Sequence, residues 1–386
     1  MDKIMGYMRP NGKIGIRNHV LIIPSVGCAA HVSDSISREV PGSIYLDNQY
    51  GCGQIGKDLK QSFRTLAGLG SNPNVAAVLV VGLGCEALRP EELVMEIAKS
   101  GKPVEMLLIQ ESGGTTKTIK KGVQIARNMV EEASKIKSEL YSIENIVLGL
   151  ECGGSDTTSG LAANPALGYA ADLLIKQGGK VILSETPEMI GAEHILAKRA
   201  ISSTIADKLL KVVKAFEQKA IDEGENIRET QPSPGNKAGG LTTIEEKSLG
   251  CVYKAGTSNI NDVVDYAEPI KEKGLTVMNT PGQDVQSMIG MLAGGAQIIA
   301  FTTGRGNPCG TPIAPVIKIT GNLQTYKKMK ENFDVYVGDL IESDSSMEIE
   351  GLKIYNKILD ACNGKETISE KLGHREFAMW RIGTTY

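Results

Sequence analysis

The hydrophobic positions of this chain fall into short runs that lack polar alternation. The runs are rich in β-branched residues and lie at 19–24, 76–81, 104–109, 146–150, 181–184, 276–278 and 298–302. Uninterrupted apolar runs of this length are typical of strands that are buried on both faces of a parallel sheet. We therefore expect these segments to form the central strands of the fold.

Between these runs lie segments with apolar residues at three- and four-residue spacing. They cover residues 31–40, 117–140, 166–177 and 194–222, and this spacing predicts amphipathic helices. Strand and helix thus alternate, which favours an α/β fold. The predicted architecture is two or three Rossmann-like parallel-sheet units whose strand-to-helix loops converge on a central site.

Two places are candidates for domain boundaries. One lies near residue 141, and the other is the polar segment 224–236, which contains Pro and Gly and lacks apolar periodicity. The expected units are residues 1–140 with cysteine-bearing loops, 141–230 with the loop ECGGSD, and 231–386 with the loop GRGNPCGTP.

Composition excludes several classes of function. The 42 Lys and Arg residues nearly balance the 45 Asp and Glu residues, so nucleic acid is not an expected partner. Aromatic residues make up only 4% of the chain, which leaves few rings for stacking on bases or sugars. No apolar stretch reaches the roughly 20 residues of a membrane-spanning helix, and no signal-peptide core is present. We expect a cytoplasmic protein without a membrane partner.

The seven cysteines are expected to be free thiols or metal ligands, because a reducing compartment disfavours disulfides. Cys28, Cys52, Cys85 and Cys152 each follow a predicted strand. Loops that leave the carboxyl ends of parallel strands gather at one edge of the sheet, so these four thiols are expected to lie together. Thiolates favour iron, an iron–sulfur cluster or zinc over magnesium and calcium. Cys251 lacks this setting and is expected to be a core or surface thiol.

The segment ECGGSDTTSGLAANPALG concentrates polar side chains in a Gly-rich loop. Ser155, Asp156 and Asn164 suit a polyhydroxy or carboxylate ligand, and a series of local side-chain-to-backbone turns explains them equally well.

Two further segments carry positive charge. Residues 236–250 hold Lys237, and TTGRGNPCGTPIAPVIKITGN holds Arg305 and Lys318 in a Gly/Pro-rich frame. The second segment predicts a rigid anion-binding loop. His31 lies just beyond Cys28 and can reach the same site, although a lone histidine is more often a surface or core residue.

Taken together, the motifs resemble a known family. GYMRPNGKIGIRN, VGCAA, YGCGQ, LGCEAL, ECGGSDTTSGLAANPALG, GNKAGGLTTIEEKSLG, TTGRGNPCGTPIAPVIKITGN and LGHREF follow one another over residues 6–380. In this order they resemble the altronate and galactarate dehydratase (UxaA) family. Its members are iron-dependent lyases that remove water from sugar acids to give 2-keto-3-deoxy acids. A relative in the same family is the large subunit of (2R)-sulfolactate sulfo-lyase, which expels sulfite.

The resemblance implies assignments for individual residues. It implies iron, as Fe2+ or an iron–sulfur cluster, and we assign its binding to Cys28, Cys52, Cys85 and Cys152. A base is needed near the C2 hydrogen of the substrate, and the candidates are Lys237, His31 and Glu86. The expected substrate-binding residues are Arg17, Asn18, Ser155, Asp156, Asn164, Arg305 and Lys318.

The resemblance also implies partners. Long-chain members carry a small amino-terminal SAF domain, and this chain opens directly with GYMRPNGKIG. We therefore expect a separate small SAF-domain subunit, a small hydroxy-acid substrate and a homo-oligomer. C–S lyase chemistry and a non-catalytic metal- or anion-binding subunit remain alternatives. A nicotinamide-dependent oxidoreductase is disfavoured, because the chain has no G-x-G-x-x-G fingerprint.

Overall fold

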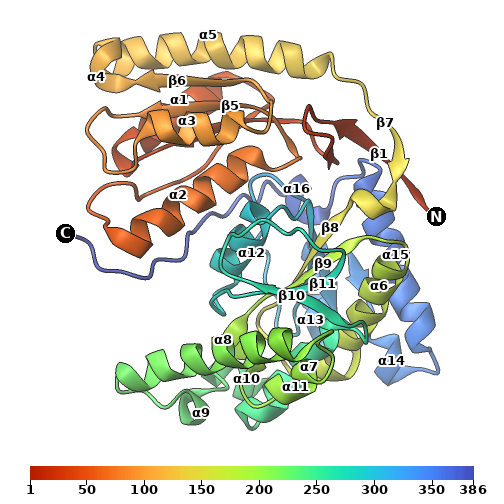
Figure 1. Cartoon of the computed structure of the whole chain (residues 1–386). Helices are drawn as coiled ribbons and strands as arrows, with labels where there is room; N and C mark the ends of the chain where they lie inside the picture. The colour runs from red at the N-terminus through yellow and green to blue at the C-terminus, as the bar shows by residue number, and fades with distance from the viewer.

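The computed structural model describes all 386 residues and contains two parallel sheets, each flanked by helices (Figure 1). The amino-terminal sheet has the order β4-β3-β5-β6. Its strands are β3 (His19–Pro24), β4 (Ser43–Tyr45), β5 (Val75–Gly82) and β6 (Val104–Leu108), and all of their pairings are parallel. Its helices are α1 (Ala30–Glu39), α2 (Gly56–Ser71), α3 (Pro90–Ala98), the short α4 (Ile109–Ser112) and α5 (Thr115–Ser134).

The larger sheet has seven parallel strands in the order β10-β11-β9-β8-β12-β13-β14. Its strands are β8 (Val147–Cys152), β9 (Lys180–Leu183), β10 (Ile260–Val264), β11 (Gly274–Met278), β12 (Ile298–Thr302), β13 (Val316–Thr320) and β14 (Val335–Tyr336). The first strand of the unit, β8, lies in the middle. The chain builds the sheet first on the β9 side of β8 and later on the β12 side, which is the topology of a doubly wound fold.

Helices cover this sheet and extend beyond it. They are α6 (Asn164–Lys176), α7 (Glu193–Ala197), α8 (Ser203–Asp222), α9 (Ile227–Thr230), α10 (Pro234–Ala238), α11 (Ile244–Val252), α12 (Asp284–Ala293), α13 (Leu323–Lys328), α14 (Asp339–Glu342), α15 (Met347–Cys362) and α16 (Ile368–Lys371). None of the helices in the chain combines the length and the apolar character needed to cross a membrane.

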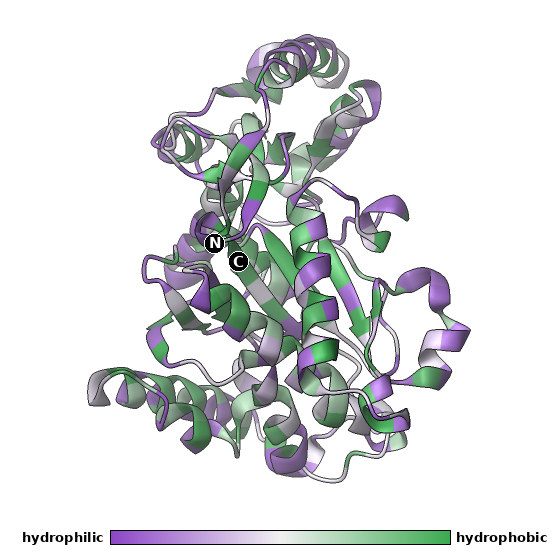
Figure 2. Cartoon of the chain, turned by 90° about the vertical axis from the view of Figure 1, so that its right-hand side faces the viewer, coloured by the Kyte–Doolittle hydropathy of each residue, from purple (hydrophilic) through white to green (hydrophobic).

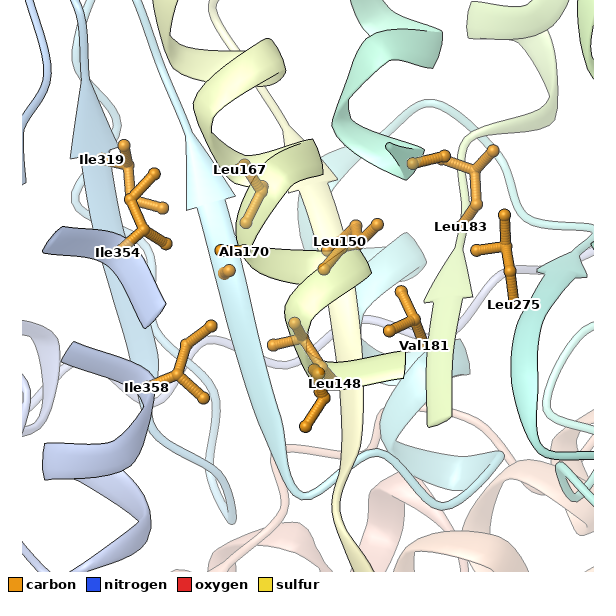
Figure 3. Close-up of a cluster of buried hydrophobic side chains, with 14 of the residues drawn as sticks. Leu148, Leu150, Leu167, Ala170, Val181, Leu183, Leu275, Ile319, Ile354 and Ile358 are labelled. Atoms are coloured by element: carbon orange, nitrogen blue, oxygen red, sulfur yellow. The ribbon is translucent and has the colours of Figure 1, made fainter. Parts of the chain in front are cut away.

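The core of the larger unit is packed from strands and two adjacent helices (Figure 3). Leu148 and Leu150 of β8 contact the face of α6 that carries Leu167, and Ile354 and Ile358 of α15 lie beside it. Each of these side chains is fully buried, and burying one contributes about 1.5–3 kcal/mol. Figure 2 shows the consequence: the strands of the sheet are hydrophobic, and hydrophilic segments concentrate in the loops and on the outer helices.

A third, small sheet and the carboxyl-terminal segment connect the two units. β1 (Lys3–Met8) pairs antiparallel with β2 (Ile14–Gly15) and with β7 (Glu139–Ser142). Helix α2 packs on α12, where a Cβ on Gly68 would collide with the carbonyl oxygen of Ala293, so only glycine fits this contact. The segment after α16 crosses back to the amino-terminal unit, and its Arg381 pairs with Asp58 at 2.7 Å.

The α/β class predicted from the sequence is confirmed, and so are most of the strands. The division of residues 141–386 at segment 224–236 is corrected by the sheet, because β8 and β9 hydrogen-bond in the same sheet as β10–β14. The polar segment is part of a helical insertion between β9 and β10, where α9 and α10 lie on the surface. The segment 224–236 is polar because it is exposed to solvent, and it does not separate two domains.

Candidate functional site

A pocket of about 390 Å³ lies at the carboxyl ends of β8, β9 and β11. It is lined by Cys152 at the end of β8, Ser155 in the loop after β8, Asp284 of α12 and Lys247 of α11. Ligands of parallel α/β sheets bind at this edge, where the strand-to-helix loops meet. The pocket is therefore the first candidate for a functional site.

Three carboxylates lie close together, and one of them, Asp284, lines this pocket. The donor oxygens of Glu151, Glu185 and Asp284 all lie within 4.8 Å of one another. Glu151 and Glu185 are fully buried, and one oxygen of each (Oε1) has no hydrogen-bond partner. Unpaired buried carboxylate oxygens are costly, so a ligand that satisfies them would stabilise the site.

Burial dominates the electrostatics of this carboxylate group. Desolvation, reinforced by the charges of Glu185 and Asp284, raises the pKa of Glu151 well above its ordinary value. Burial raises the pKa of Glu185 to about 8 and that of Asp284 to about 6. The group therefore binds protons near neutral pH unless a cation compensates its charge.

A buried lysine neutralises part of this charge. Lys254, which follows α11, donates to Oε2 of Glu185 at 2.6 Å and to Sγ of Cys251 at 2.7 Å. The ammonium group is fully buried. Glu185 has a positive φ of 66°, which is uncommon for a residue with a side chain and places its carboxylate under the pocket.

Cys152 carries the thiol that opens onto the pocket. A hydrogen bond from Cys251 and the nearby Lys254 ammonium lower the pKa of Cys152 to about 5, against the opposing effect of burial. Its Sγ also lies 3.1 Å from the Oγ of Ser155. The thiolate is therefore the favoured form at neutral pH. Cys251 is buried, as expected of a core thiol, and its sulfur also accepts from Lys254 within this cluster.

Polar side chains in and after the ECGGSD loop form hydrogen bonds that fix the loop beside the pocket. Asp156 accepts hydrogen bonds from Thr158, Ser159 and Asn322, so its carboxylate is used by the protein itself. Asn164 donates to the carbonyl of Gly250 and accepts from Thr302. The two residues shape the loop, as the local-turn interpretation predicts, and Ser155 is the member of the predicted set that lines the pocket.

Lys247 provides positive charge at the pocket wall. Its Nζ lies 2.8 Å from Oε1 of Glu188, and both side chains are 11% exposed. The charge of Glu188 and the hydrogen bond to it raise the pKa of Lys247 despite its burial. The ammonium form is therefore stable and is paired with Glu188, so Lys247 is not a base.

The predicted anion-binding loop contains one exposed and one buried cation. Arg305 is exposed and lines a second cavity of about 680 Å³ together with Asn322, Lys327 and Lys328. Lys318 is fully buried, its Nζ lies 3.4 Å from the centre of the Phe301 ring, and burial lowers its pKa to about 7. Its role in clamping a substrate is therefore not supported by its position.

Two predicted substrate-binding residues connect parts of the fold. Arg17 forms a two-pronged ion pair with Glu370, with Nε–Oε1 at 2.7 Å and Nη2–Oε2 at 2.8 Å. Asn18 accepts from Arg9 and donates to the carbonyl of Ala133. Both side chains are used by the fold, and their assignment to a substrate stays a prediction.

The three candidate bases lie outside the pocket. Lys237 is exposed on α10, and His31 is exposed in the first turn of α1. Glu86 is 8% exposed and accepts hydrogen bonds from Ser25 and from backbone amides of its own loop. Against the effect of burial, these bonds keep the pKa of Glu86 below its ordinary value, so it is a poor base.

The four predicted metal-binding thiols do not form a preassembled mononuclear site. Cys152 is buried in the larger unit, whereas Cys28, Cys52 and Cys85 are exposed on loops of the amino-terminal sheet. The group whose donor atoms all lie within 4.8 Å consists of carboxylates and includes none of these thiols. Cys28, Cys52 and Cys85 follow their strands as expected and Cys152 is the last residue of its strand, but the strands belong to two different sheets.

Glu185, Lys247, Lys254, Cys251 and Asp284 were not identified from the sequence. Glu185 and Asp284 come shortly after β9 and β11, so the strand-end rule that selected the cysteines also applies to them. Lys247 and Lys254 lie in and after a helix, and nothing in their local sequence distinguishes them from surface lysines.

Comparison with known proteins finds sugar-acid dehydratases and a sulfo-lyase subunit among the relatives of this chain. Residues 143–385 match the family described as D-galactarate/altronate dehydratase, C-terminal, and residues 6–134 match the second domain of D-galactarate dehydratase/altronate hydrolase. Altronate dehydratase of Bacillus subtilis is 37% identical over 98% of this chain and 78% of its own length. The beta subunit of (2R)-sulfolactate sulfo-lyase of Chromohalobacter salexigens is 36% identical over 98% of this chain and 97% of its own length. Galactarate dehydratase (L-threo-forming) of Escherichia coli is 32% identical over 97% of this chain and 76% of its own length.

Proposed function

This chain belongs to the D-galactarate/altronate dehydratase family, and on that premise we propose that it is a hydro-lyase that removes water from a sugar acid such as altronate or galactarate. The product would be a 2-keto-3-deoxy acid. The observation that carries the proposal is the pocket at the carboxyl edge of the seven-stranded sheet, which is lined by Cys152, Lys247, Glu188 and Asp284. Its Asp284 also belongs to the group of three close carboxylates.

The first requirement of the reaction is to hold an anionic substrate. We assign this role to Lys247, which lines the pocket and whose raised pKa keeps it charged. An ammonium group pairs with a carboxylate as a point charge. The backbone amides of Gly153 and Gly154 also border the pocket.

The second requirement is removal of the weakly acidic C2 proton. We assign proton transfer to Cys152, because its sulfur opens onto the pocket and Ser155, Asn164 and Cys251 surround it with polar groups. Lys254 lies behind this group and favours its negative charge. The proton would pass from C2 of the substrate to Sγ of Cys152.

The metal expected for the family requires ligand atoms, and the side chains near the pocket include a group that can supply them. Glu151, Glu185 and Asp284 offer oxygen ligands, and the unpartnered Oε1 atoms of Glu151 and Glu185 fit a divalent cation such as Fe2+. When bound there, a divalent cation would act as a Lewis acid for the developing enediolate and the leaving hydroxide. Lys254 would then serve to balance the remaining negative charge of Glu185.

The experiment is an assay with altronate and galactarate, performed anaerobically with Fe2+, in which the 2-keto acid is measured. We expect activity to require Cys152, so that Cys152→Ala loses at least 100-fold in kcat, as removal of a general base does. Lys237→Gln, in an exposed residue outside the pocket, is the matched control. Full activity of Cys152→Ala would contradict the assignment.

A small partner subunit is part of the proposal. It is supported by the relative from Chromohalobacter, which is named a subunit and which this chain matches over 97% of that relative's length. The assay should therefore be run with the chain alone and with a candidate SAF-domain subunit. Absence of activity in both cases would favour a non-catalytic binding subunit.

The same match favours a second candidate function, C–S lyase chemistry on sulfolactate. Both reactions begin with removal of the proton next to the carboxylate and differ in the leaving group. Release of sulfite from sulfolactate, compared with release of a 2-keto acid from altronate, distinguishes the two.

A further inference from the structure

A further cavity lies at the edge of the seven-stranded sheet opposite the candidate pocket. It has a volume of about 410 Å³ and is bordered by the starts of β8 and β9, by the loop between β1 and β2, and by Pro73 of the amino-terminal unit. This volume is in the range of small-molecule sites. The candidate pocket lies at the carboxyl ends of the same strands, and no residue lines both cavities.

Lysine side chains dominate the charge of this cavity. Lys13, Lys180 and Lys273 line it, together with one carboxylate, Glu144. Glu144 pairs with Lys273 at 3.0 Å. Lys180 donates to the carbonyl of Lys271 at 2.7 Å, and neither Lys180 nor Lys13 has a carboxylate within ion-pair distance. Two of the three ammonium groups that line the cavity therefore have no counter-ion from the protein.

These ammonium groups repel one another. Burial lowers the pKa of Lys180, and the charges of Lys13 and Lys273 lower it as well. The exposed Glu272 acts in the opposite direction, but the pKa of Lys180 remains below its ordinary value. A positive charge lowers the pKa of a lysine because it destabilises the charged form. An anion between these groups would reverse the effect.

Two buried basic side chains lie behind Pro73. Nε of Arg9 donates to the carbonyl of Pro73 at 2.6 Å, and Nζ of Lys102 donates to the carbonyl of Asn72 at 2.7 Å. Their other hydrogen bonds also go to uncharged oxygen atoms. Burial, followed by the charges of Arg9 and Lys13, lowers the pKa of Lys102 well below its ordinary value. Positive charge thus accumulates on this side of the cavity too, and such a region attracts anions.

A buried glutamine holds the walls of the cavity in place. Gln297 is 1% exposed. Its amide group donates to the carbonyls of Ile14 and Asn145 and accepts from the amide of Val147. Its own carbonyl accepts from Asn74 at 2.8 Å. The small sheet, the seven-stranded sheet and the amino-terminal unit are therefore joined at this point, and the lysines project from a rigid frame.

We propose that this cavity binds a small multivalent oxyanion, of the class of inorganic phosphate and phosphate monoesters, through Lys13, Lys180 and Lys273. An ammonium group offers three donors and binds phosphate oxygens as a point charge. Lys13 comes from the loop between β1 and β2, whereas Lys180 and Lys273 lie at the starts of β9 and β11. The anion would therefore bridge the small sheet and the seven-stranded sheet.

This inference goes beyond the proposed function, because the cavity lies at the other edge of the sheet and contains no residue assigned to the reaction. Its ligand is an effector or a structural ion and not the substrate. Since the three lysines are brought together only in the folded chain, the bound anion stabilises the fold.

The experiment is isothermal titration calorimetry of the full chain with inorganic phosphate at pH 7 and constant ionic strength. We expect one phosphate per chain. The dissociation constant should rise about tenfold or more in Lys13→Gln and in Lys180→Gln, because each variant loses a charge-assisted contact. Lys120→Gln is the matched control, since Lys120 is an exposed lysine of α5 outside the cavity, and it should bind phosphate as the wild type does.

A titration with ribose 5-phosphate distinguishes the two sources of the anion. Tighter binding of the ester identifies a phosphorylated metabolite as the ligand, and equal or weaker binding identifies phosphate itself. Absence of binding of both probes to the wild type, or unchanged dissociation constants in both cavity variants, would overturn the proposal. Loss of binding in Lys247→Gln alone would also overturn it, because the anion would then lie in the candidate pocket.

Thermal unfolding provides a second measurement. Without phosphate, Lys13→Gln should unfold at the wild-type temperature or above it, because the substitution removes a repelled charge that has no partner. Phosphate should raise the unfolding temperature of the wild type more than that of Lys13→Gln. A lower unfolding temperature of Lys13→Gln without phosphate, or an equal rise in the two proteins, would contradict the proposal.

Discussion

The Nζ atom of Lys254 lies 2.6 Å from Oε2 of Glu185, and both side chains are fully buried although 69 residues separate them along the chain. The pair joins the end of β9 to the segment after α11. It therefore ties the helical insertion to the sheet directly below the candidate pocket.

Lys254→Met is expected to destabilise the protein by about 1–3 kcal/mol, because it removes the donor to the buried Oε2 of Glu185 and Sγ of Cys251. Urea unfolding at pH 7 measures this change. Lys273→Met is the control, since it removes an exposed ion pair with Glu144, and such pairs contribute little. Equal free energies of unfolding of Lys254→Met and Lys273→Met would show that the buried pair does not stabilise the fold more than an exposed pair does.

Lys247→Gln is expected to raise the KM for the sugar acid by about tenfold or more, because a charge-assisted contact to the substrate carboxylate is lost. The kcat should change less than KM. Steady-state kinetics check this, with Lys237→Gln as the matched lysine outside the pocket. An unchanged KM would remove Lys247 from substrate binding.

Arg17→Met is expected to lower stability by about 1–3 kcal/mol and to leave KM unchanged. The guanidinium holds Glu370 and also donates to the carbonyls of Ile16 and Ala361, so its removal leaves several acceptors unpaired. Thermal unfolding measures the loss of stability, and steady-state kinetics measure KM. Arg38→Met, which removes an exposed pair with Asp34, should have little effect. A large rise in KM for Arg17→Met would restore its substrate-binding role.

Stability is expected to fall as the pH drops from about 6.5 towards 4, in part through His19. Burial and the charge of Arg17 lower the pKa of His19 to about 4, whereas the unfolded chain has the ordinary value near 6.5. In this window the unfolded state binds a proton that the folded state does not, so acid favours unfolding. In His19→Gln, the free energy of unfolding should therefore change less between pH 7 and pH 5. Urea unfolding at pH 7 and pH 5 measures the free energy of unfolding of the wild type and of His19→Gln. An equal loss of stability in the two proteins between these pH values would show that His19 does not contribute to it.

Local pattern predicted much of the fold. The runs 19–24 and 298–302 coincide with β3 and β12, and the run 76–81 lies within β5. This succeeds because a strand buried on both faces requires consecutive apolar residues, which is a local property. The helix predicted over 194–222 is broken into α7 and α8, and the strand order could not be predicted from local pattern.

For the candidate site, too, the sequence predicted local features, and the tertiary structure decided which residues lie together. The sequence by itself determined that Cys28, Cys52, Cys85 and Cys152 lie at or just beyond the ends of strands, and its motifs identified the altronate and galactarate dehydratase family. Only the tertiary structure decided that Cys152 lies beside Cys251 and Lys254 while the other three thiols occupy another sheet. The physical reason is that periodicity records the burial of each segment, whereas the distance between side chains depends on strand order and on how the loops between strands pack.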